Sequence, residues 1–141
     1  MTTPETPPFR IGNLGEIAIR CRDYAAMQRF YRDVLGLEFL AEPVSGICFF
    51  RMAPGYLGHT QVLALFSPDA GPPRTGDGSS LHHIALGIAA ADQAAAQQWL
   101  LSRGFVADFQ HFTWIGWRGL FTKDPDGNTV ELVAYVGSSV S

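Results

Sequence analysis

The sequence predicts an α+β fold built from two copies of one βαβββ unit in tandem. Strand-like and helix-like segments follow one another in the same order twice, as a strand, a helix and three further strands. In addition, residues 16–19 resemble residues 83–86, and residues 62–65 resemble residues 129–132. Both pairs of segments are separated by 67 positions. A constant offset at the two ends of a unit is typical of an internal repeat.

The first unit is expected to span residues 11–67. Apolar and β-branched residues alternate over 14–21, which predicts a strand. Asp23 then offers a side-chain cap for a helix, and apolar residues recur at helical spacing until Gly36, a residue type that commonly follows a helix. Three more strands are predicted over 37–41, 46–52 and 60–66.

The second unit is expected to span residues 81–136, after a proline- and glycine-rich linker over 68–80. It repeats the same order, with a strand over 81–88, a helix over 89–103 that ends at Gly104, and strands over 105–110, 117–122 and 129–136. The sequence Asp-Pro-Asp-Gly-Asn at 124–128 predicts a tight turn. We expect a single domain over 11–136, with disordered tails at 1–10 and 137–141.

Composition argues against several classes of function. The chain has 141 residues, enough for one domain with a buried core, and its 47% hydrophobic and 16% charged residues are typical of a globular protein. A net charge of −3 and a single lysine, Lys123, leave no basic surface for nucleic acid. No apolar run is long enough to span a bilayer, and the N-terminus lacks the features of a secretory signal. The spacing of Cys21 and Cys48 is not that of a metal or redox motif. We therefore expect a cytoplasmic protein without nucleic-acid or membrane partners.

Strand alternation separates an apolar face from a face that carries ionisable residues. Glu16 and His83 occupy equivalent positions in the two units, and Glu131 is equivalent to Ala64. If the units pack about a pseudo-twofold axis, these positions converge. Two carboxylates and an imidazole brought together need a compensating charge, which a divalent cation supplies. Three protein ligands with open positions are typical of a catalytic metal site.

Each of these residues also has a plainer interpretation: Glu16 and Glu131 as surface carboxylates, and His83 as a hydrogen-bonded core histidine. His82 is expected on the strand face opposite to His83, in a structural role. His59 and His111 are candidates for acid–base catalysis or are loop histidines without a role. Four residues are candidates for substrate contacts: Phe49, Arg51, Trp117 and Arg118. The plainer interpretation is core packing for the two aromatic residues and solvent exposure for the two arginines.

Segments 16–23, 30–37, 82–86 and 123–132 together resemble the vicinal oxygen chelate superfamily. This superfamily includes glyoxalase I, extradiol dioxygenases, methylmalonyl-CoA epimerase, fosfomycin-resistance enzymes and bleomycin-resistance proteins. The resemblance covers roughly residues 12–136. It implies paired βαβββ modules in an eight-stranded U-shaped cup with the helices on its outer face, around one divalent metal. It also implies a homodimer, in which modules pair within a chain or across chains.

The resemblance places the metal ligands at Glu16, His83 and Glu131, with Ala64 at the fourth position. Glyoxalase-like and epimerase-like members keep a polar ligand or base where this chain has Ala64, so that proton abstraction is not available here. Extradiol dioxygenases and metal-dependent fosfomycin enzymes use three ligands, with histidine where this chain has Glu16. One histidine and two glutamates suit Fe²⁺, Mn²⁺, Zn²⁺ or Ni²⁺ without choosing among them.

We therefore expect a metal-dependent enzyme that acts on a small oxygen-bearing organic molecule, with the metal as a Lewis acid and with dioxygenase-like or lyase-like chemistry. The alternative is a metal-free protein of the bleomycin-resistance kind, which binds and sequesters a small molecule. A purely structural role leaves the three ionisable residues unexplained. The metal content of the purified protein separates the first two hypotheses.

Overall fold

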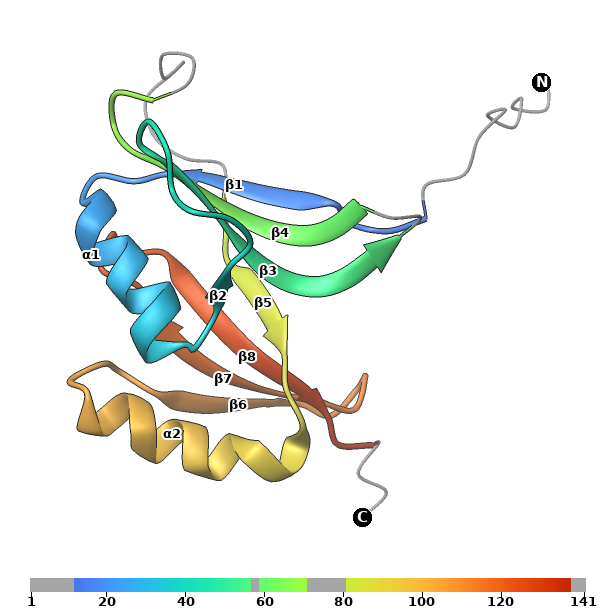
Figure 1. The fold of residues 1–141 in the computed structure, drawn as a ribbon. Coiled ribbons are helices and arrows are strands. Elements are labelled where there is room, and N and C mark those ends of the chain that lie inside the picture. Colours follow the sequence, from blue (N-terminus) through green and yellow to red (C-terminus); the bar gives the residue numbers. More distant parts are fainter. Residues whose placement is uncertain (1–11, 57–58, 71–80, 138–141) are drawn as a thin grey trace, which may run out of the picture.

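The computed structural model describes residues 12–56, 59–70 and 81–137. Over these residues the chain forms two modules in tandem, each with a helix and a four-stranded mixed sheet (Figure 1). This arrangement confirms the α+β fold of two βαβββ modules that the repeat predicts. The predicted N-terminal tail, most of the linker and most of the C-terminal tail fall outside the described residues.

Module 1 consists of β1 (Glu16–Arg20), α1 (Tyr24–Arg29), β2 (Glu38–Phe39), β3 (Ile47–Tyr56) and β4 (His59–Phe66). The Asp23 side chain accepts a hydrogen bond from the Ala26 amide at 3.0 Å, so it caps α1 as predicted. The helix continues as a π-helical segment over Phe30–Val34, and Gly36 follows with a φ of +77°. A left-handed residue at this point ends the helix, and glycine adopts that conformation without steric cost.

Module 2 consists of β5 (Ile84–Gly87), a 3₁₀ turn (Ala90–Asp92), α2 (Gln93–Ser102), β6 (Asp108–Phe112), β7 (Trp117–Lys123) and β8 (Thr129–Tyr135). Its strand order is β5-β8-β7-β6, and that of module 1 is β1-β4-β3-β2, so one topology occurs twice. None of the helices in the described part of the chain is long and apolar enough to cross a membrane.

The strand register confirms the repeat at single residues. In module 1, β1 pairs in parallel with β4 and places Ala18 beside Ala64. In module 2, β5 pairs in parallel with β8 and places Ala85 beside Glu131. Both residues of the second pair lie 67 positions after their counterparts, which is the offset found in the sequence. Ala64 and Glu131 are therefore equivalent positions of the two sheets.

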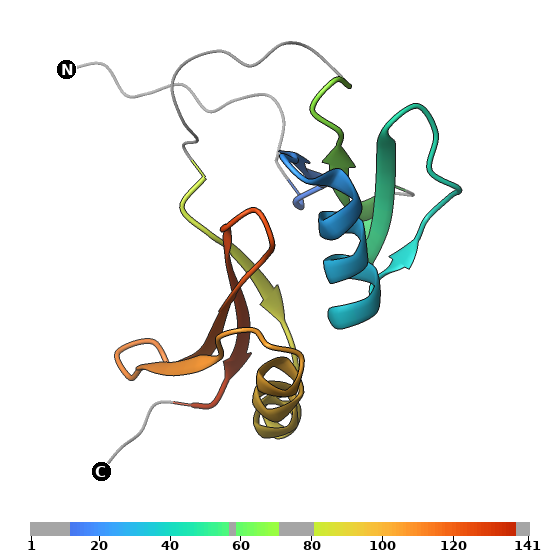
Figure 2. The same cartoon turned by 90° about the vertical axis from the view of Figure 1, so that its left-hand side faces the viewer.

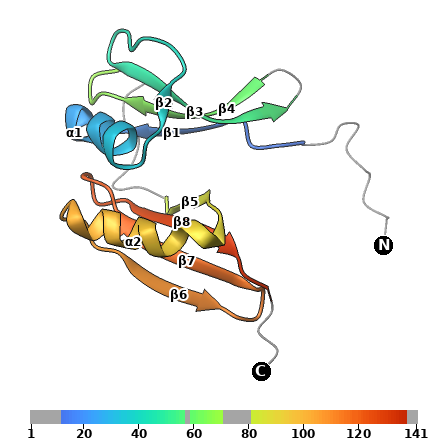
Figure 3. The same ribbon diagram turned by 60° about the horizontal axis from the view of Figure 1, so that its bottom comes forward.

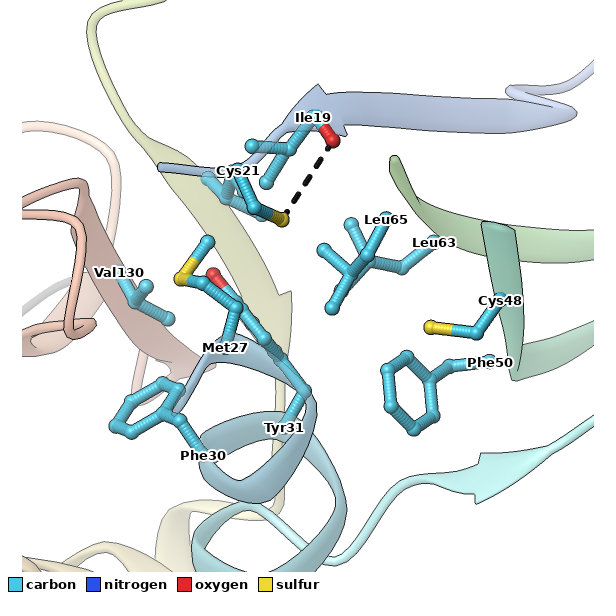
Figure 4. Close-up of a cluster of buried hydrophobic side chains, with 11 residues drawn as sticks. Ile19, Cys21, Met27, Phe30, Tyr31, Cys48, Phe50, Leu63, Leu65 and Val130 are labelled. Atoms are coloured by element: carbon cyan, nitrogen blue, oxygen red, sulfur yellow. Dashed lines mark hydrogen bonds between the residues drawn. The ribbon is translucent and has the colours of Figure 1, made fainter. Parts of the chain in front are cut away.

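The helix α1 and its π-helical continuation pack against both sheets. Met27 of α1 and Phe30 and Tyr31 of the π-helical segment belong to one apolar cluster (Figure 4). The cluster also includes residues of the module 1 sheet and Ile84 and Val130 of the module 2 sheet. Figures 2 and 3 show α1 between the two sheets. The helix α2 packs on the module 2 sheet through a second apolar cluster. Burial of these side chains is the main source of stability, because it removes apolar surface from water. We call the side of each sheet that is turned away from the helices the outer face of that module; it corresponds to the inside of the cup that the resemblance implies, whose helices lie on the outside.

A polar contact joins the modules beside this core. The Tyr31 hydroxyl donates a hydrogen bond to the Asp124 carboxylate at 2.7 Å. Asp126 accepts hydrogen bonds from the backbone amides of Arg22 and Asp23, at 2.6 Å and 3.1 Å. These amides stand at the start of α1, where exposed N–H groups favour a negative charge. The Asp-Pro-Asp-Gly-Asn turn of module 2 thus holds the helix of module 1.

Candidate metal centre

The structure brings together two of the three predicted metal ligands. Glu131 lies in β8 and is 5% exposed. Its Oε1 atom lies 3.2 Å from Nε2 of His83, the residue directly before β5. In the described part of the chain, His83 is the one side chain that pairs with Glu131. A buried carboxylate with a single imidazole partner is short of positive charge, because burial penalises a charge that is not compensated.

The Glu131 carboxylate lies against β7, over Gly119. A Cβ atom at position 119 would overlap Oε2 and Cδ of Glu131 and the ring of Phe121. The backbone at Gly119 is not left-handed, so this glycine provides space rather than backbone freedom. The absence of a side chain at this position lets a buried carboxylate lie flat on the sheet and face His83.

Aromatic side chains surround the pair on the outer face of the module 2 sheet. Phe121 is in register with Glu131, and its ring centroid lies 6.4 Å from that of His83. Phe112 meets Phe121 edge-on at 6.2 Å, and Trp117 follows on the same face with 45% of its surface exposed. A few polar groups within an apolar, aromatic surface are typical of a site that binds a small molecule.

Glu16 does not join this pair within the chain. It begins β1, is exposed, and lies on the outer face of the module 1 sheet in register with Val62. Among the described residues, no three side chains of His, Cys, Asp or Glu gather closely enough to hold a metal ion. One imidazole and one carboxylate suit a divalent cation chemically, but they supply only two ligands. The expected convergence of three ligands is therefore not formed in a single chain.

Three of the predicted substrate contacts lie on the outer faces. Phe49 and Arg51 of β3 are in register with Ala64 and Val62, so they share the outer face of module 1 with Glu16. Trp117 is in register with Tyr135 of β8, which lies four residues after Glu131. Side chains an even number of residues apart in a strand share a face, so Trp117 and Glu131 both lie on the outer face of module 2. The contacts predicted from the sequence are thus divided between the two modules.

Arg118 and His111 lie on the other side of the module 2 sheet. The Nε atom of Arg118 donates to Oε1 of Gln93 at 2.6 Å, and Gln93 is a fully buried residue of α2. His111 is the register partner of Arg118 in β6, so it shares that side. Neighbours on a strand alternate in direction, so Trp117 and Arg118 cannot both face the site. The structure places Arg118 and His111 on the side of the sheet opposite to the pair. It places His59 at the start of β4, in the other module.

His82 contacts His83, which corrects the expectation that the two residues occupy opposite faces. The strand β5 begins only at Ile84, so strand alternation does not extend back to these residues. Their Nδ1 atoms are 2.8 Å apart, and their rings meet edge-on with centroids separated by 5.1 Å. Strand periodicity cannot predict this contact, because both histidines lie before the strand begins. The only sign of it in the sequence is that the two histidines are adjacent.

A cavity of about 550 Å³ lies between the modules, and it is a separate feature. Its lining is mostly apolar, with Asp92 as the one ionisable residue, and it includes none of Glu16, His83 and Glu131. We place the candidate site at the His83–Glu131 pair instead, because metal binding and acid–base chemistry need ionisable groups.

Known proteins share this architecture. The sequence profile of the Glyoxalase/Bleomycin resistance protein/Dioxygenase superfamily matches residues 13–132. The chain belongs to this superfamily. Its members typically bind a divalent metal, act on or bind small molecules, and commonly form dimers. A comparison with curated proteins gives no match.

Three solved structures from this superfamily illustrate the similarity. Lactoylglutathione lyase from Agrobacterium tumefaciens is 25% identical over 92% of this chain and 96% of that protein, with a TM-score of 0.61. A glyoxalase/dioxygenase from Nostoc punctiforme is 22% identical over 96% of this chain and 99% of that chain, with a TM-score of 0.67. The fosfomycin resistance protein FosX from Listeria monocytogenes is 19% identical over 89% of this chain and 94% of that chain, with a TM-score of 0.64. The latter two support the fold alone.

Proposed function

We propose that the protein is a metal-dependent enzyme that acts on a small oxygen-bearing organic molecule. The observation that carries the proposal is the His83–Glu131 pair. An imidazole nitrogen and a buried carboxylate oxygen face each other at 3.2 Å on an open sheet face, where one divalent ion can bind both. Membership of a superfamily whose members typically bind a divalent metal supports this reading of the pair.

In this proposal Glu16 of a second copy supplies the third ligand. Within one chain it lies on the outer face of module 1, and the pair lies on the outer face of module 2. The two faces have the same topology, and Glu16 is the equivalent of His83 in the repeat. Packing the outer face of module 1 from one copy on that of module 2 from another joins eight strands into a cup with three ligands. The proposed homodimer thus contains two such cups.

The remaining residues of the two faces give the cup its chemistry. A divalent ion bound there acts as a Lewis acid on substrate oxygens. Phe49 and Trp117 offer apolar surface to the carbon skeleton, and the exposed Arg51 can pair with an anionic group. Ala64 is fully buried and offers no base at the fourth position. This favours dioxygenase-like or lyase-like chemistry over isomerisation by proton abstraction.

Elemental analysis tests the metal. Untagged protein, prepared anaerobically and without chelators, is expected to contain about one Fe, Mn, Zn or Ni ion per chain. His83→Ala and Glu131→Ala should lose this metal, and His111→Ala, on the other side of the same sheet, should keep it. If wild-type protein takes up no ion from a panel of divalent metals, the proposal fails. The chain is then a metal-free binding protein, and Glu131→Ala leaves its affinity for the small molecule intact.

Mixed dimers test the source of Glu16. Glu16→Ala and His83→Ala chains with different tags are co-expressed, and the mixed dimer is isolated through both tags. If Glu16 acts across the dimer, one of the two sites regains all three ligands and the mixed dimer binds metal more tightly than either parent. If Glu16 acts within its own chain, or has no role, neither site is restored and the mixed dimer binds no better than the parents.

A further inference from the structure

We propose that His82 is a positioning residue, whose ring nitrogen fixes the orientation and the tautomer of His83. The inference rests on the proposed role of His83 as a metal ligand and extends it to a residue that does not itself touch the metal. It is carried by the contacts of the two ring nitrogens of His83, which have different neighbours. Nε2 faces the Glu131 carboxylate at 3.2 Å, and Nδ1 faces Nδ1 of His82 at 2.8 Å.

The short distance between the two Nδ1 atoms requires one hydrogen between them, so one ring donates and the other accepts. A neutral histidine carries a single ring hydrogen, and a metal binds the nitrogen that lacks it. When Nε2 of His83 is the ligand, its hydrogen is therefore on Nδ1. His82 is then the acceptor, through the lone pair of its own Nδ1. Ligating histidines commonly have such an acceptor at the second nitrogen, which raises their basicity and fixes the ring.

The surroundings of His83 show why it needs this support. Its backbone precedes β5, whose paired residues start at Ile84, so the sheet ladder does not hold it. The side chain of His83 is 35% exposed. On the sheet its ring faces that of Phe121, and the centroids of the two rings are 6.4 Å apart. The edge-on ring of His82, at 5.1 Å, is the nearer neighbour. Without His82, the ring of His83 can rotate away from Glu131.

The metal-free and metal-bound forms place different demands on the two rings. In the metal-free protein either ring can donate, because the roles of the two Nδ1 atoms depend on the tautomers of the rings. Once Nε2 of His83 binds a metal, only the arrangement with His82 as the acceptor remains. The His82–His83 hydrogen bond thus persists in both forms, and metal binding fixes its direction.

Two variants of His82 test the proposal through metal affinity. His82→Phe keeps a ring of similar size and removes both nitrogens, whereas His82→Asn retains an amide group near the position of Nδ1, whose oxygen can accept and whose N–H can donate. We expect His82→Phe to raise the dissociation constant for Zn²⁺, measured by chelator competition, about 10- to 100-fold. His82→Asn should recover most of this loss, and the matched control His111→Phe should bind as wild type does. Because His82 is exposed, all three variants should share the wild-type melting temperature. Equal affinity of His82→Phe and wild type contradicts the proposal.

A second measurement separates failure of this inference from failure of the proposed function. Long-range ¹H–¹⁵N spectra of the imidazoles, recorded on metal-free protein, report which nitrogens of His83 carry hydrogen. We expect His82→Phe to change the Nδ1 signal of His83 and His82→Asn to preserve a hydrogen-bonded one. An unchanged His83 spectrum in His82→Phe contradicts the positioning role even if the protein binds metal. If wild-type protein binds no metal but His82→Phe does change the spectrum, the contact is real and the proposed function is wrong.

Discussion

The carboxylate of Glu131 occupies the space that a side chain at Gly119 would need. The two residues lie on adjacent strands, β8 and β7, and Glu131 reaches across the outer face toward His83. A buried acid in the middle of a sheet is unfavourable unless its surroundings accommodate and compensate it. Here a glycine accommodates it sterically, and a ring nitrogen of His83 lies 3.2 Å from its Oε1 atom. The candidate site thus depends on a residue with no functional group of its own.

Gly119→Ala should displace the Glu131 carboxylate and weaken metal binding. The new methyl group overlaps the carboxylate and the Phe121 ring, so we expect a loss of about 1–3 kcal/mol in the free energy of unfolding as well. Gly87→Ala is the matched control, because it lies in the same sheet, has no left-handed φ, and finds nothing within 4 Å of an added Cβ. Urea unfolding and metal titration of both variants check this. Equal effects of the two substitutions would show that Gly119 makes no special room.

Tyr31→Phe should loosen the contact between the modules. The hydroxyl of this fully buried tyrosine donates to Asp124 at 2.7 Å and links the π-helical segment that follows α1 to the turn of module 2. Loss of a hydrogen bond to a charged group costs about 1.5–3 kcal/mol. Tyr135→Phe removes a hydroxyl from a residue that is 72% exposed, so it should leave stability unchanged. Denaturant unfolding followed by tryptophan fluorescence measures both. A loss in Tyr31→Phe no larger than in the control would mean that the contact does not stabilise the chain.

The stability of the wild type should fall in alkaline solution, partly through Tyr31. Burial, followed by the charge of Asp124 and the hydrogen bond to it, raises the pKa of Tyr31 far above its usual range. The folded chain therefore keeps this tyrosine neutral, whereas the unfolded chain ionises it near pH 10. The stabilising contribution is complete below about pH 10 and declines as the pH rises above that value toward the folded pKa. Unfolding curves from pH 8 to 11 should show a smaller decline in Tyr31→Phe than in wild type.

Both cysteines should be unreactive in the folded protein. Cys21 and Cys48 are each 1% exposed, and burial, with a smaller effect from Asp126, raises the pKa of Cys21 to about 12. Because the thiolate is the reactive form, a disulfide reagent at pH 8 should modify neither thiol until the protein unfolds. Two equivalents should react in denaturant, since the chain has two cysteines. Rapid modification of one thiol under native conditions would show that the core beside α1 opens.

The repeat offset is the part of the fold that sequence reasoning predicts best. A constant separation of 67 positions places Ala64 opposite Glu131 in the two modules, and the strand register confirms it. The helix ends are predicted equally well, because Asp23, Gly36 and Gly104 act through local hydrogen bonding and backbone conformation alone. These features depend on residues close in the sequence, which is why one sequence suffices to find them.

The environment of His83 was less accessible to the same reasoning. Alternation places His82 on the opposite face only if the strand begins before residue 82, whereas β5 begins at Ile84. Alternation also cannot say which of two adjacent residues faces a site. Trp117 and Arg118 are both candidates from the sequence, and a buried glutamine of the helix α2, Gln93, accepts a hydrogen bond from Arg118 on the helix side of the sheet. Contacts between distant elements settle such choices, and periodicity does not encode them.

The position of Glu16 relative to the pair depends on how whole modules pack. The repeat makes the two sheets equivalent but does not determine which sheets meet, and much of the linker between them lies outside the described residues. In the chain, α1 and its π-helical continuation pack against both sheets, on the side that is turned away from the outer faces. The outer face of module 1 in one copy is therefore proposed to pack on that of module 2 in another.

Ala18→Arg should prevent the proposed pairing of outer faces. Ala18 is exposed in the middle of β1, on the same face as Glu16, and its neighbour in β4 is Ala64. A long cationic side chain there can extend into solvent in a single chain, so the stability of the subunit should change by less than about 0.5 kcal/mol. In the proposed dimer the same side chain meets the opposing sheet. Light scattering should therefore find a dimer for the wild type and a monomer for Ala18→Arg, and the monomer should bind metal only weakly, because it retains two ligands.

Ala94→Arg is the matched control for this experiment, because Ala94 is an exposed alanine of α2, on the helix side of module 2. It introduces the same charge and length away from both outer faces, so it should remain dimeric and bind metal as the wild type does. A monomeric Ala94→Arg would show that charge alone, or the helix side, governs assembly. A dimeric Ala18→Arg with full metal affinity would place the interface elsewhere and remove Glu16 of the second copy from the site.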